Sequence, residues 1–174
     1  MSEATKTYEA KKGIDIILLY RFLKNAKTEA AFKLAFQTEH SNEISRDSDP
    51  QKTKDGNIQN LGAVEYDFSA KSIAAKGDKH IDELKDALLK GEIIEIWEID
   101  KAEKNQDNKY KATYYQGYVT KFSTNPNSED SVELELEFSI NGVGKTGYAT
   151  LTDEQAKVVQ YVFKDTTVVS LNTY

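Results

Sequence analysis

Residues 132–140 read VELELEFSI and carry the clearest pattern in this chain of 174 residues. Side chains of a β-strand point to opposite faces at every second residue. One face of this stretch is apolar and holds Val132, Leu134, Leu136, Phe138 and Ile140. The other face holds Glu133, Glu135 and Glu137. The alternation predicts a half-buried strand whose second face is acidic.

The preceding segment, 110–122, alternates in the same way. Its expected core face holds Tyr110, Ala112, Tyr114, Tyr118 and Phe122, and Tyr115 points the other way. Asn125, Pro126 and Asn127 form a turn between the two segments. Matching the apolar faces across this turn places Phe122 opposite Val132 and Lys121 opposite Glu133.

Further strands are expected at 14–23, 32–44, 64–70 and 92–100. Both faces of the first are apolar, which predicts a strand covered on both sides. One helix is well marked. Asp78 is a suitable N-cap, Ile81, Leu84 and Leu88 form one apolar stripe, and Gly91 suits the C-terminus.

The intervening segments are polar. Residues 46–62, with Pro50 and the pair Asp55–Gly56, are interpreted as a long loop, and 103–109 as a hairpin loop. Asn141–Gly142 is a turn signal before a short strand, and Thr152 to Gln155 is a capping-box pattern that opens a short helix. The predicted fold class is mainly β, a sandwich or curved barrel of two antiparallel sheets with one flanking α-helix.

The composition excludes several classes of function. The chain has 23 Lys and Arg against 29 Asp and Glu, a net charge of −6, no Cys and a hydrophobic fraction of 39%. The acidic balance argues against a general nucleic-acid binder, and the lack of Cys excludes disulfides and thiolate chemistry. No secretory signal is expected in the polar start, and the longest apolar run, 16–19, predicts no membrane span. The low apolar fraction predicts that part of the chain lies outside the hydrophobic core of the monomer, in solvated segments or in surface that contacts a partner.

No constellation of residues supports catalysis. Residues 142–146 (GVGKT) look like the end of a P-loop, but Ser139 stands where the first Gly is needed. The three glutamates of 132–140 stand about 7 Å apart, near a glycosidase separation, but nothing apolar flanks them to split their pKa values. His40 and His80 are interpreted as solvated surface, and Asp47, Asp49 and Asp55 miss a calcium-loop spacing. We expect no enzyme, cofactor or metal.

Eight ordered segments resemble the major tail protein family of long-tailed, non-contractile bacteriophages. They are DIILL (15–19), KLAFQTEH (33–40), KTKDG (52–56), AKGD (75–78), GEIIEIWEID (91–100), YKATYYQGYVT (110–120), EDSVELELEFSINGVGKTGYATLT (129–152) and VVQYVFKDT (158–166). The resemblance covers residues 13–166 without a large gap. It implies a tail-tube β domain over 13–166, with an N-terminal arm at 1–12 and a C-terminal arm at 167–174.

The resemblance implies a structural virion protein. Six copies would close a ring whose inner wall is a continuous β-barrel, and stacked rings would form the tail tube through which the genome passes. The fold is shared with contractile-tail tubes and type VI secretion systems. Implied partners are further copies of the chain, the tape measure, the tail terminator and the distal tail proteins, with assembly in the bacterial cytoplasm.

Two sets of site residues follow from the resemblance. The 46–62 segment and the arms would reach adjacent subunits or rings, and this loop contains Arg46, Asp47, Asp49, Pro50, Lys52, Lys54 and Asp55. The row Glu133, Glu135 and Glu137 is a candidate for the lumen wall, where carboxylates repel phosphates and let DNA slide without specific binding. An ordinary solvated outer face is the alternative for this row.

Two other classes remain open. One is a monomeric β-sandwich that binds a glycan or a protein through its Tyr, Trp or loop residues. The other is a small hydrolase that uses the acidic row. The mass in solution and negative-stain microscopy distinguish both from a tube protein.

Overall fold

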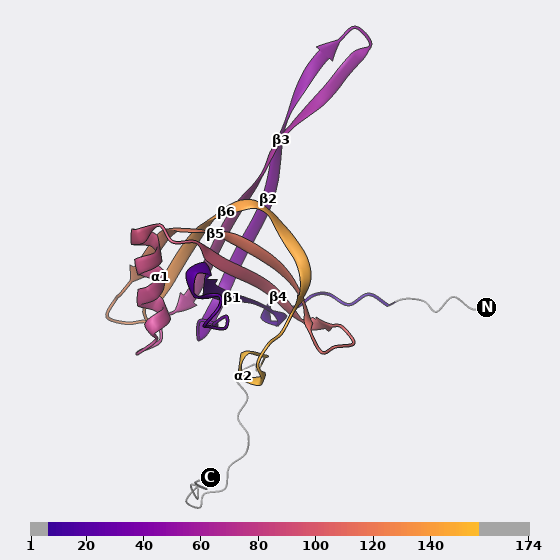
Figure 1. The fold of residues 1–174 in the computed structure, drawn as a ribbon. Coiled ribbons are helices and arrows are strands. Elements are labelled where there is room, and N and C mark those ends of the chain that lie inside the picture. The colour runs from indigo at the N-terminus through magenta and orange to yellow at the C-terminus, as the bar shows by residue number, and fades with distance from the viewer. Residues whose placement is uncertain (1–6, 157–174) are drawn as a thin grey trace, which may run out of the picture.

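The computed structural model describes residues 7–156. Six strands form one antiparallel sheet in the order β1–β4–β5–β6–β3–β2 (Figure 1). The strand bounds are Ile16–Phe22 (β1), Phe36–Thr53 (β2), Gly56–Ile73 (β3), Ile94–Lys104 (β4), Tyr110–Asn125 (β5) and Glu133–Ala149 (β6). The helices are Lys79–Lys90 (α1) and Asp153–Ala156 (α2), with 3₁₀ turns at Gly13–Asp15 and Leu23–Asn25.

The sheet curls so that its two halves face each other, which confirms the mainly β fold and its curved-barrel form. Rings meet across the interior between strands that are not neighbours in the sheet. The ring centroids of Tyr20 (β1) and Phe138 (β6) lie 5.7 Å apart, and those of Phe68 (β3) and Tyr115 (β5) lie 5.4 Å apart. The two layers are therefore halves of a single continuous sheet.

The two outermost strands approach each other at one point. The side-chain amide of Gln37 (β2) donates to the Leu18 carbonyl at 2.6 Å and accepts from the Leu18 N–H at 3.0 Å. Phe32 forms an isolated bridge with Tyr20 on the same edge of β1. These contacts satisfy the edge of β1 within the chain, because an edge strand otherwise presents unpaired N–H and C=O groups.

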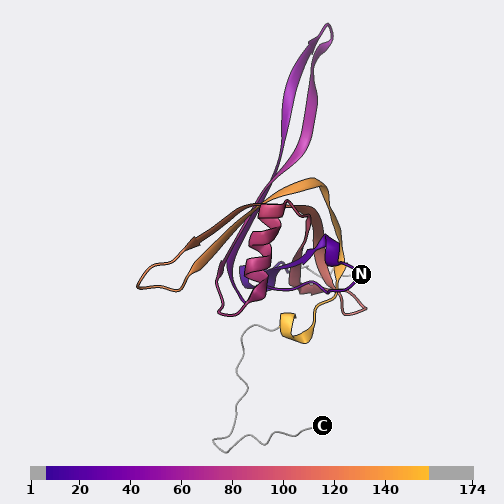
Figure 2. The same ribbon diagram turned by 60° about the vertical axis from the view of Figure 1, so that its left-hand side comes forward.

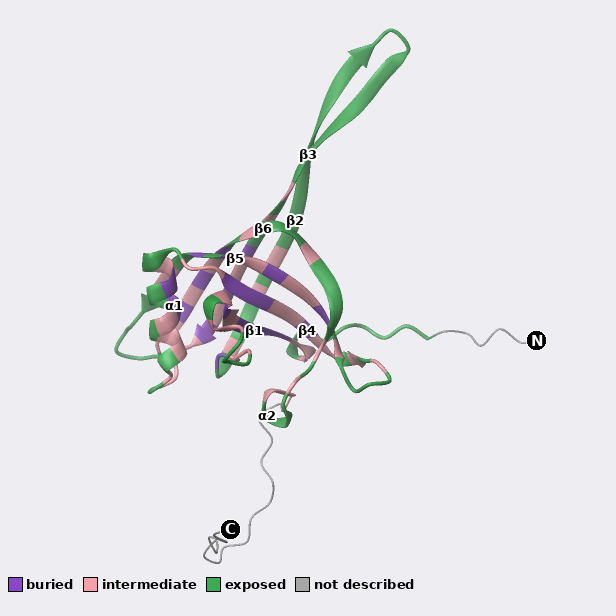
Figure 3. Ribbon diagram, viewed as in Figure 1, coloured by how far each residue is buried: buried purple, intermediate pink, exposed green. Residues whose placement is uncertain are grey.

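The main core fills the concave side of this sheet, and a smaller cluster covers the opposite face of β1, β4 and β5. The core includes Leu18, Tyr20, Phe68, Ile94, Ile96, Leu134, Leu136 and Phe138. Ile17 and Leu19 belong to the second cluster, so β1 is covered on both faces as its sequence predicts. Figure 3 shows the buried residues confined to the barrel and helix.

Helix α1 begins and ends where the sequence predicted. The Asp78 carboxylate accepts from the His80 N–H at 3.0 Å, and Gly91 has the left-handed φ of 67° that ends the helix. Leu84 and Ala87 are buried in the core. Figure 2 shows α1 in front of the curved sheet. Among residues 7–156 no helix has the length and apolar content needed to cross a membrane.

The capping box at the start of α2 is also confirmed. The Gln155 N–H donates to Thr152 Oγ1 at 3.2 Å, and the Thr152 N–H donates to Gln155 Oε1 at 3.0 Å. The expectations for residues 157–174, including the C-terminal arm, lie outside the described residues.

Three details of the strand predictions are wrong. Lys121 pairs with Glu137 and Phe122 with Leu136, because an irregularity between Val119 and Lys121 and a longer connection shift the register. Asn141–Gly142 is no hairpin turn, since β6 runs on through it. Tyr115 lies in the main core, whereas Tyr118 is exposed and Tyr114 faces the second cluster side.

Tyr115 and Val119 share the core face of β5, and the register shift between Val119 and Lys121 moves Phe122 to that face. The prediction therefore grouped Phe122 with tyrosines of the opposite face. A second irregularity lies beside Tyr115. Register is lost between Tyr114 and Gln116 of β5, opposite the stretch of β6 where Gly142 has a φ of 64°. Gly144 lies so close to the Tyr115 ring that a Cβ there would collide with it. The extra residues of β6 therefore arch over Tyr115.

Candidate assembly surfaces

Residues 46–62 are not a loop, and this corrects the sequence interpretation. The strands β2 and β3 continue through them as a hairpin with the two-residue turn Lys54–Asp55 (Figure 1). The composition of these residues is typical of turns, and their paired strands have no apolar face. Hydrophobic alternation therefore could not predict the strand pairing. Pro50 is compatible with this ladder because β2 is an edge strand.

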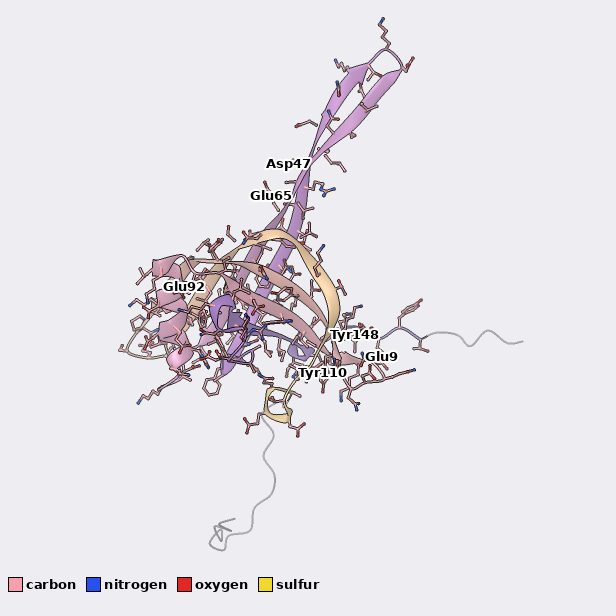
Figure 4. The ribbon with its side chains drawn as sticks, in the orientation of Figure 1. Glu9, Asp47, Glu65, Glu92, Tyr110 and Tyr148 are labelled. Carbon is pink, nitrogen blue, oxygen red and sulfur yellow. The ribbon has the colours of Figure 1, made fainter. Side chains whose placement is uncertain are left out.

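The seven predicted loop residues lie along β2 and in the turn of this hairpin. Arg46 pairs with Val64, Asp49 with Asn60, Pro50 with Gln59 and Lys52 with Asn57, while Lys54 and Asp55 form the turn. Asp47 lies at a register shift between Arg46 and Ser48, where the hairpin leaves the barrel (Figure 4).

Every residue from 43 to 63 is exposed. Three of them are large and apolar: Ile44, Ile58 and Leu61 are 58%, 52% and 64% exposed. The turn is held locally, since Thr53 Oγ1 donates to the Gly56 carbonyl at 2.6 Å. A two-stranded hairpin without a packed face is marginal by itself in water, so this projection suits a contact with another chain.

The predicted row Glu133, Glu135 and Glu137 lies on the outer face of β6, away from the main core. All three side chains are half-buried. Lys121 Nζ lies 3.2 Å from both Glu135 Oε1 and Glu137 Oε1. Hydrogen bonds to Glu137 and Glu135 raise the pKa of Lys121.

The register extends this row into a wider acidic layer, which sequence reasoning missed. Outward-facing positions of β2 and β3 pair with one another and with β6, and their side chains share its outer face. The layer has seven carboxylates, Glu39, Glu43, Glu65, Asp67, Glu133, Glu135 and Glu137, against the two lysines Lys71 and Lys121. Lys71 Nζ lies 3.0 Å from Glu39 Oε1, and this bond raises the pKa of Lys71.

Open strand edges bound this acidic layer on both sides. Within residues 7–156, β2 pairs only with β3, so its other edge from 39 to 46 has no strand partner. On the far side, β4 pairs with β5 only as far as Gly117, so 118–125 has no strand partner on that edge in the described part of the chain. The length of β6 beyond Ser139 also lacks a second strand among these residues. Such edges are templates for pairing with another chain.

Both histidines are half-buried, which corrects their placement on a solvated surface. His40 Nε2 lies 3.0 Å from Glu98 Oε2, so it connects β2 to β4 across the barrel. The His80 ring stacks on Phe32 with centroids 3.8 Å apart. No group of three or more His, Asp or Glu residues in the described part of the chain is placed to hold a metal ion. The pattern 142–146 lies inside β6, not at the start of a helix.

A second polar cluster lies on the outer face of β1, β4 and β5. Glu95, only 4% exposed, bonds the Arg21 guanidinium at 2.5 and 3.2 Å and accepts from the Tyr114 hydroxyl at 2.6 Å. The bond to Glu95 raises the pKa of Arg21, and burial followed by the Glu95 bond raises that of Tyr114. This network holds three adjacent strands together.

Comparisons with known proteins agree with one another. A family model described as a phage tail tube protein matches residues 10–146. A tail protein of Staphylococcus phage phiMR25 is 34% identical over 163 residues, which cover 90% of this chain and 83% of that protein. The tail tube protein gp17.1* of Bacillus phage SPP1 is 27% identical, over 84% of this chain but only 55% of the relative.

Solved structures show the same fold. The SPP1 tail tube matches with a TM-score of 0.76 at 21% identity, over 91% of this chain and 95% of that one. The tail of a gene transfer agent particle, refined with C6 symmetry, matches with a TM-score of 0.60 at 12% identity. That match covers 79% of this chain and 99% of the other.

Proposed function

We propose, from the premise that this chain belongs to the phage tail tube protein family, that it polymerises as stacked hexameric rings into the tube through which a phage genome is delivered. The observation that carries the proposal is the acidic layer with open strand edges on both sides. Each open edge can form one half of an interface with a neighbouring copy. A ring with sixfold symmetry needs two different patches that meet head to tail, and the two edges supply them.

In this proposal the edge of β2 from 39 to 46 pairs with the 118–125 edge of β5 in the next copy. Each copy then contributes the four strands β5, β6, β3 and β2 to one continuous wall. Closing the ring removes both open edges, since β2 and β5 each gain a neighbour in an adjacent copy. The edge of β1 takes no part because Gln37 and Phe32 already satisfy it.

The acidic layer lines the lumen in this arrangement. Its seven carboxylates are on the convex face of the wall strands, while the concave face holds each subunit's core. A lumen with a net negative charge repels the phosphates of DNA along its whole length. DNA therefore passes without specific binding, and the tube has no catalytic role.

The projecting part of the hairpin contacts the next ring. Residues 48–53 pair with 56–61 and extend about 20 Å beyond the register shift at Asp47. Ile58 and Leu61 lose exposed apolar surface when they are covered by a neighbour. The arms 1–12 and 167–174 would add contacts between subunits, and the tape measure, terminator and distal tail proteins would bind the tube and its ends. Assembly would take place in the host cytoplasm.

Light scattering and negative-stain microscopy test the tube. Rings or tubes, alone or with tail initiator proteins, are the expected result. A protein that stays monomeric at all concentrations, even with initiators present, would contradict the proposal and favour a monomeric binding module.

Site-specific labelling tests the lumen assignment separately, because the natural chain has no Cys. The variant Glu135→Cys is treated with a small maleimide and with a maleimide on a long polyethylene glycol chain, before and after assembly. We expect the small reagent to react in tubes and the bulky one to react only before assembly. Reaction with both in tubes would place Glu135 on the exterior, and reaction with neither would place it in a subunit contact.

A further inference from the structure

The face of β1, β4 and β5 opposite the main core carries a groove of about 430 Å³. We call it the Trp97 groove. The residues used in the argument below are Leu19, Arg21, Ala31, Trp97, Gly147 and Tyr148. The size is in the range of pockets that bury a bound group. This groove is separate from the acidic layer and from the hairpin.

The groove is a built apolar surface with a polar end. Its floor includes Leu19 and Ile99, which are almost fully buried, while Tyr148 at the side is 55% exposed. The Arg21 guanidinium lies 5.1 Å from the centre of the Trp97 ring and bonds the buried Glu95. Trp97 is thus held in a fixed position with its ring at the groove, and a large aromatic surface of this kind is a strong apolar contact.

The chain itself leads to this groove. Leu151 packs against the small cluster of Ile17, Leu19, Ile99 and Ala112 that underlies it. Four residues later, Gln155 Nε2 donates to the carbonyl of Ala31 at 3.0 Å, and Ala31 lines the groove. The last described residue, Ala156, is therefore fixed next to the rim.

The next residues are apolar. Residues 158–163 read VVQYVF, and five of these six side chains are Val, Tyr or Phe. Six residues in an extended conformation span about 20 Å. Because the segment begins two residues after an anchored position, its effective concentration at the groove is far above that of any separate chain.

We propose that residues 158–163 bind in the Trp97 groove of their own chain. The segment covers the exposed side of Trp97 and Tyr148 and completes the small cluster as a second core. The tail-tube domain then ends near residue 166, and only 167–174 remain available as an arm toward neighbours.

Gly147 supports a close approach of a backbone to this surface. It pairs with Ala112 on the groove side, and a Cβ built on it meets no atom within 4 Å. A side chain at 147 would therefore project into the space of the groove. This open position also makes 147 a good site for a probe, since a small side chain there disturbs nothing in the described structure.

Disulfide mapping in the full chain tests the proposal. Gly147→Cys is combined in turn with a single Cys at each of the positions 158 to 163, in a protein that otherwise has no Cys. A disulfide forms readily only when the two Cβ atoms can approach to about 3.5–4.5 Å. Ser139→Cys, on the same strand but outside the groove, replaces Gly147→Cys as the matched control.

We expect a disulfide within one chain, seen as a faster-migrating monomer on a non-reducing gel, at a subset of the six positions. Alternate positions should dominate if the segment binds as a strand. Disulfide-linked dimers at these positions would overturn the proposal in favour of a neighbouring copy as the occupant. Bond formation no faster than with the Ser139→Cys control at all six positions would overturn it altogether.

The fluorescence of Trp97 gives a second readout, because this is the single Trp of the chain. The double variant Tyr161→Ser/Phe163→Ser should increase quenching of Trp97 by acrylamide about twofold, since the ring becomes accessible to solvent. The variant Val168→Ser/Val169→Ser, in the arm beyond the segment, should leave quenching unchanged. Equal quenching in all three proteins would contradict groove binding. Both tests use the unassembled chain, so their outcome is independent of tube formation.

Discussion

The inner and outer halves of the β2–β3 hairpin are continuous in sequence but differ in burial and in the source of their stability. In the inner half, Phe68 and Ala70 of β3 are buried and pack on β5 and β6. In the outer half, beyond Asp47, every residue is exposed and the strands pair only with each other. One ladder therefore runs from a region stabilised by its own core to a region whose stability must come from outside the chain.

Removing the outer half should give the largest effect. A variant that replaces 49–60 with an Asn-Gly turn keeps the Ser48–Leu61 pair and the whole barrel. We expect the free energy of unfolding to change by less than about 0.5 kcal/mol, because no buried contact is lost. We expect stacked tubes to disappear in negative-stain images. Normal tubes from this variant would show that the hairpin does not connect rings.

The next comparison is between two apolar truncations on the same strand, β3. Phe68→Ala removes a ring that is 1% exposed and should cost about 3–5 kcal/mol of unfolding free energy. Leu61→Ala, at 64% exposure, should change it by less than about 0.5 kcal/mol. Urea titration followed by Trp97 fluorescence measures both. Similar costs for the two variants would mean that the outer half packs on something within the monomer.

Glycines on the two sides of the boundary should also differ. A Cβ at Gly117 would overlap the backbone carbonyl of Ser139, so Gly117→Ala should cost about 1–3 kcal/mol through overpacking. A Cβ at Gly62 meets the Asp47 carbonyl only at 3.5 Å, an ordinary contact. Gly62→Ala should therefore be neutral in thermal unfolding. A loss of stability at Gly62 as large as at Gly117 would contradict the described hairpin geometry.

The smallest expected effect is on pH dependence. Burial raises the pKa of Tyr20 and Tyr115 above the ordinary value of 10.0. Between pH 10 and the higher folded-state pKa, the unfolded chain loses these protons first, so the contribution of these two tyrosines to stability is constant below pH 10 and is lost above it. Residues 43–63 contain no Tyr. The trimmed and complete chains should lose stability in parallel when unfolding is followed from pH 8 to 11, and a different slope would contradict this assignment.

Sequence patterns predicted the elements whose signals are local. Asp78 and Gly91 mark the ends of α1, Thr152 and Gln155 mark the start of α2, and the alternation from Val132 to Ile140 identifies the acidic outer face of β6. Each signal depends on backbone periodicity or on a cap, and these are properties of a few consecutive residues.

The missed features depend on contacts between distant segments. The outer hairpin has no apolar face, so its strands look like a loop. The register shift between Val119 and Lys121 puts Phe122 on the same face as Tyr115, and the spread of carboxylates over β2, β3 and β6 appears only once the register is known. The sequence predicted the acidic row that is the candidate for the lumen wall. It did not predict the open strand edges through which neighbouring copies would pair.

The register shift at Asp47 has a mechanical consequence. A bulge bends a strand and increases its twist, and this one lies where the hairpin leaves its supporting core. Below it the subunit is stiff, because close-packed interiors resist compression. Above it, the described part of each copy would reach the next ring of the proposed tube through a single pair of strands. A long tube built this way would have rigid segments joined by compliant links, so it would curve under load while its bore kept a constant width.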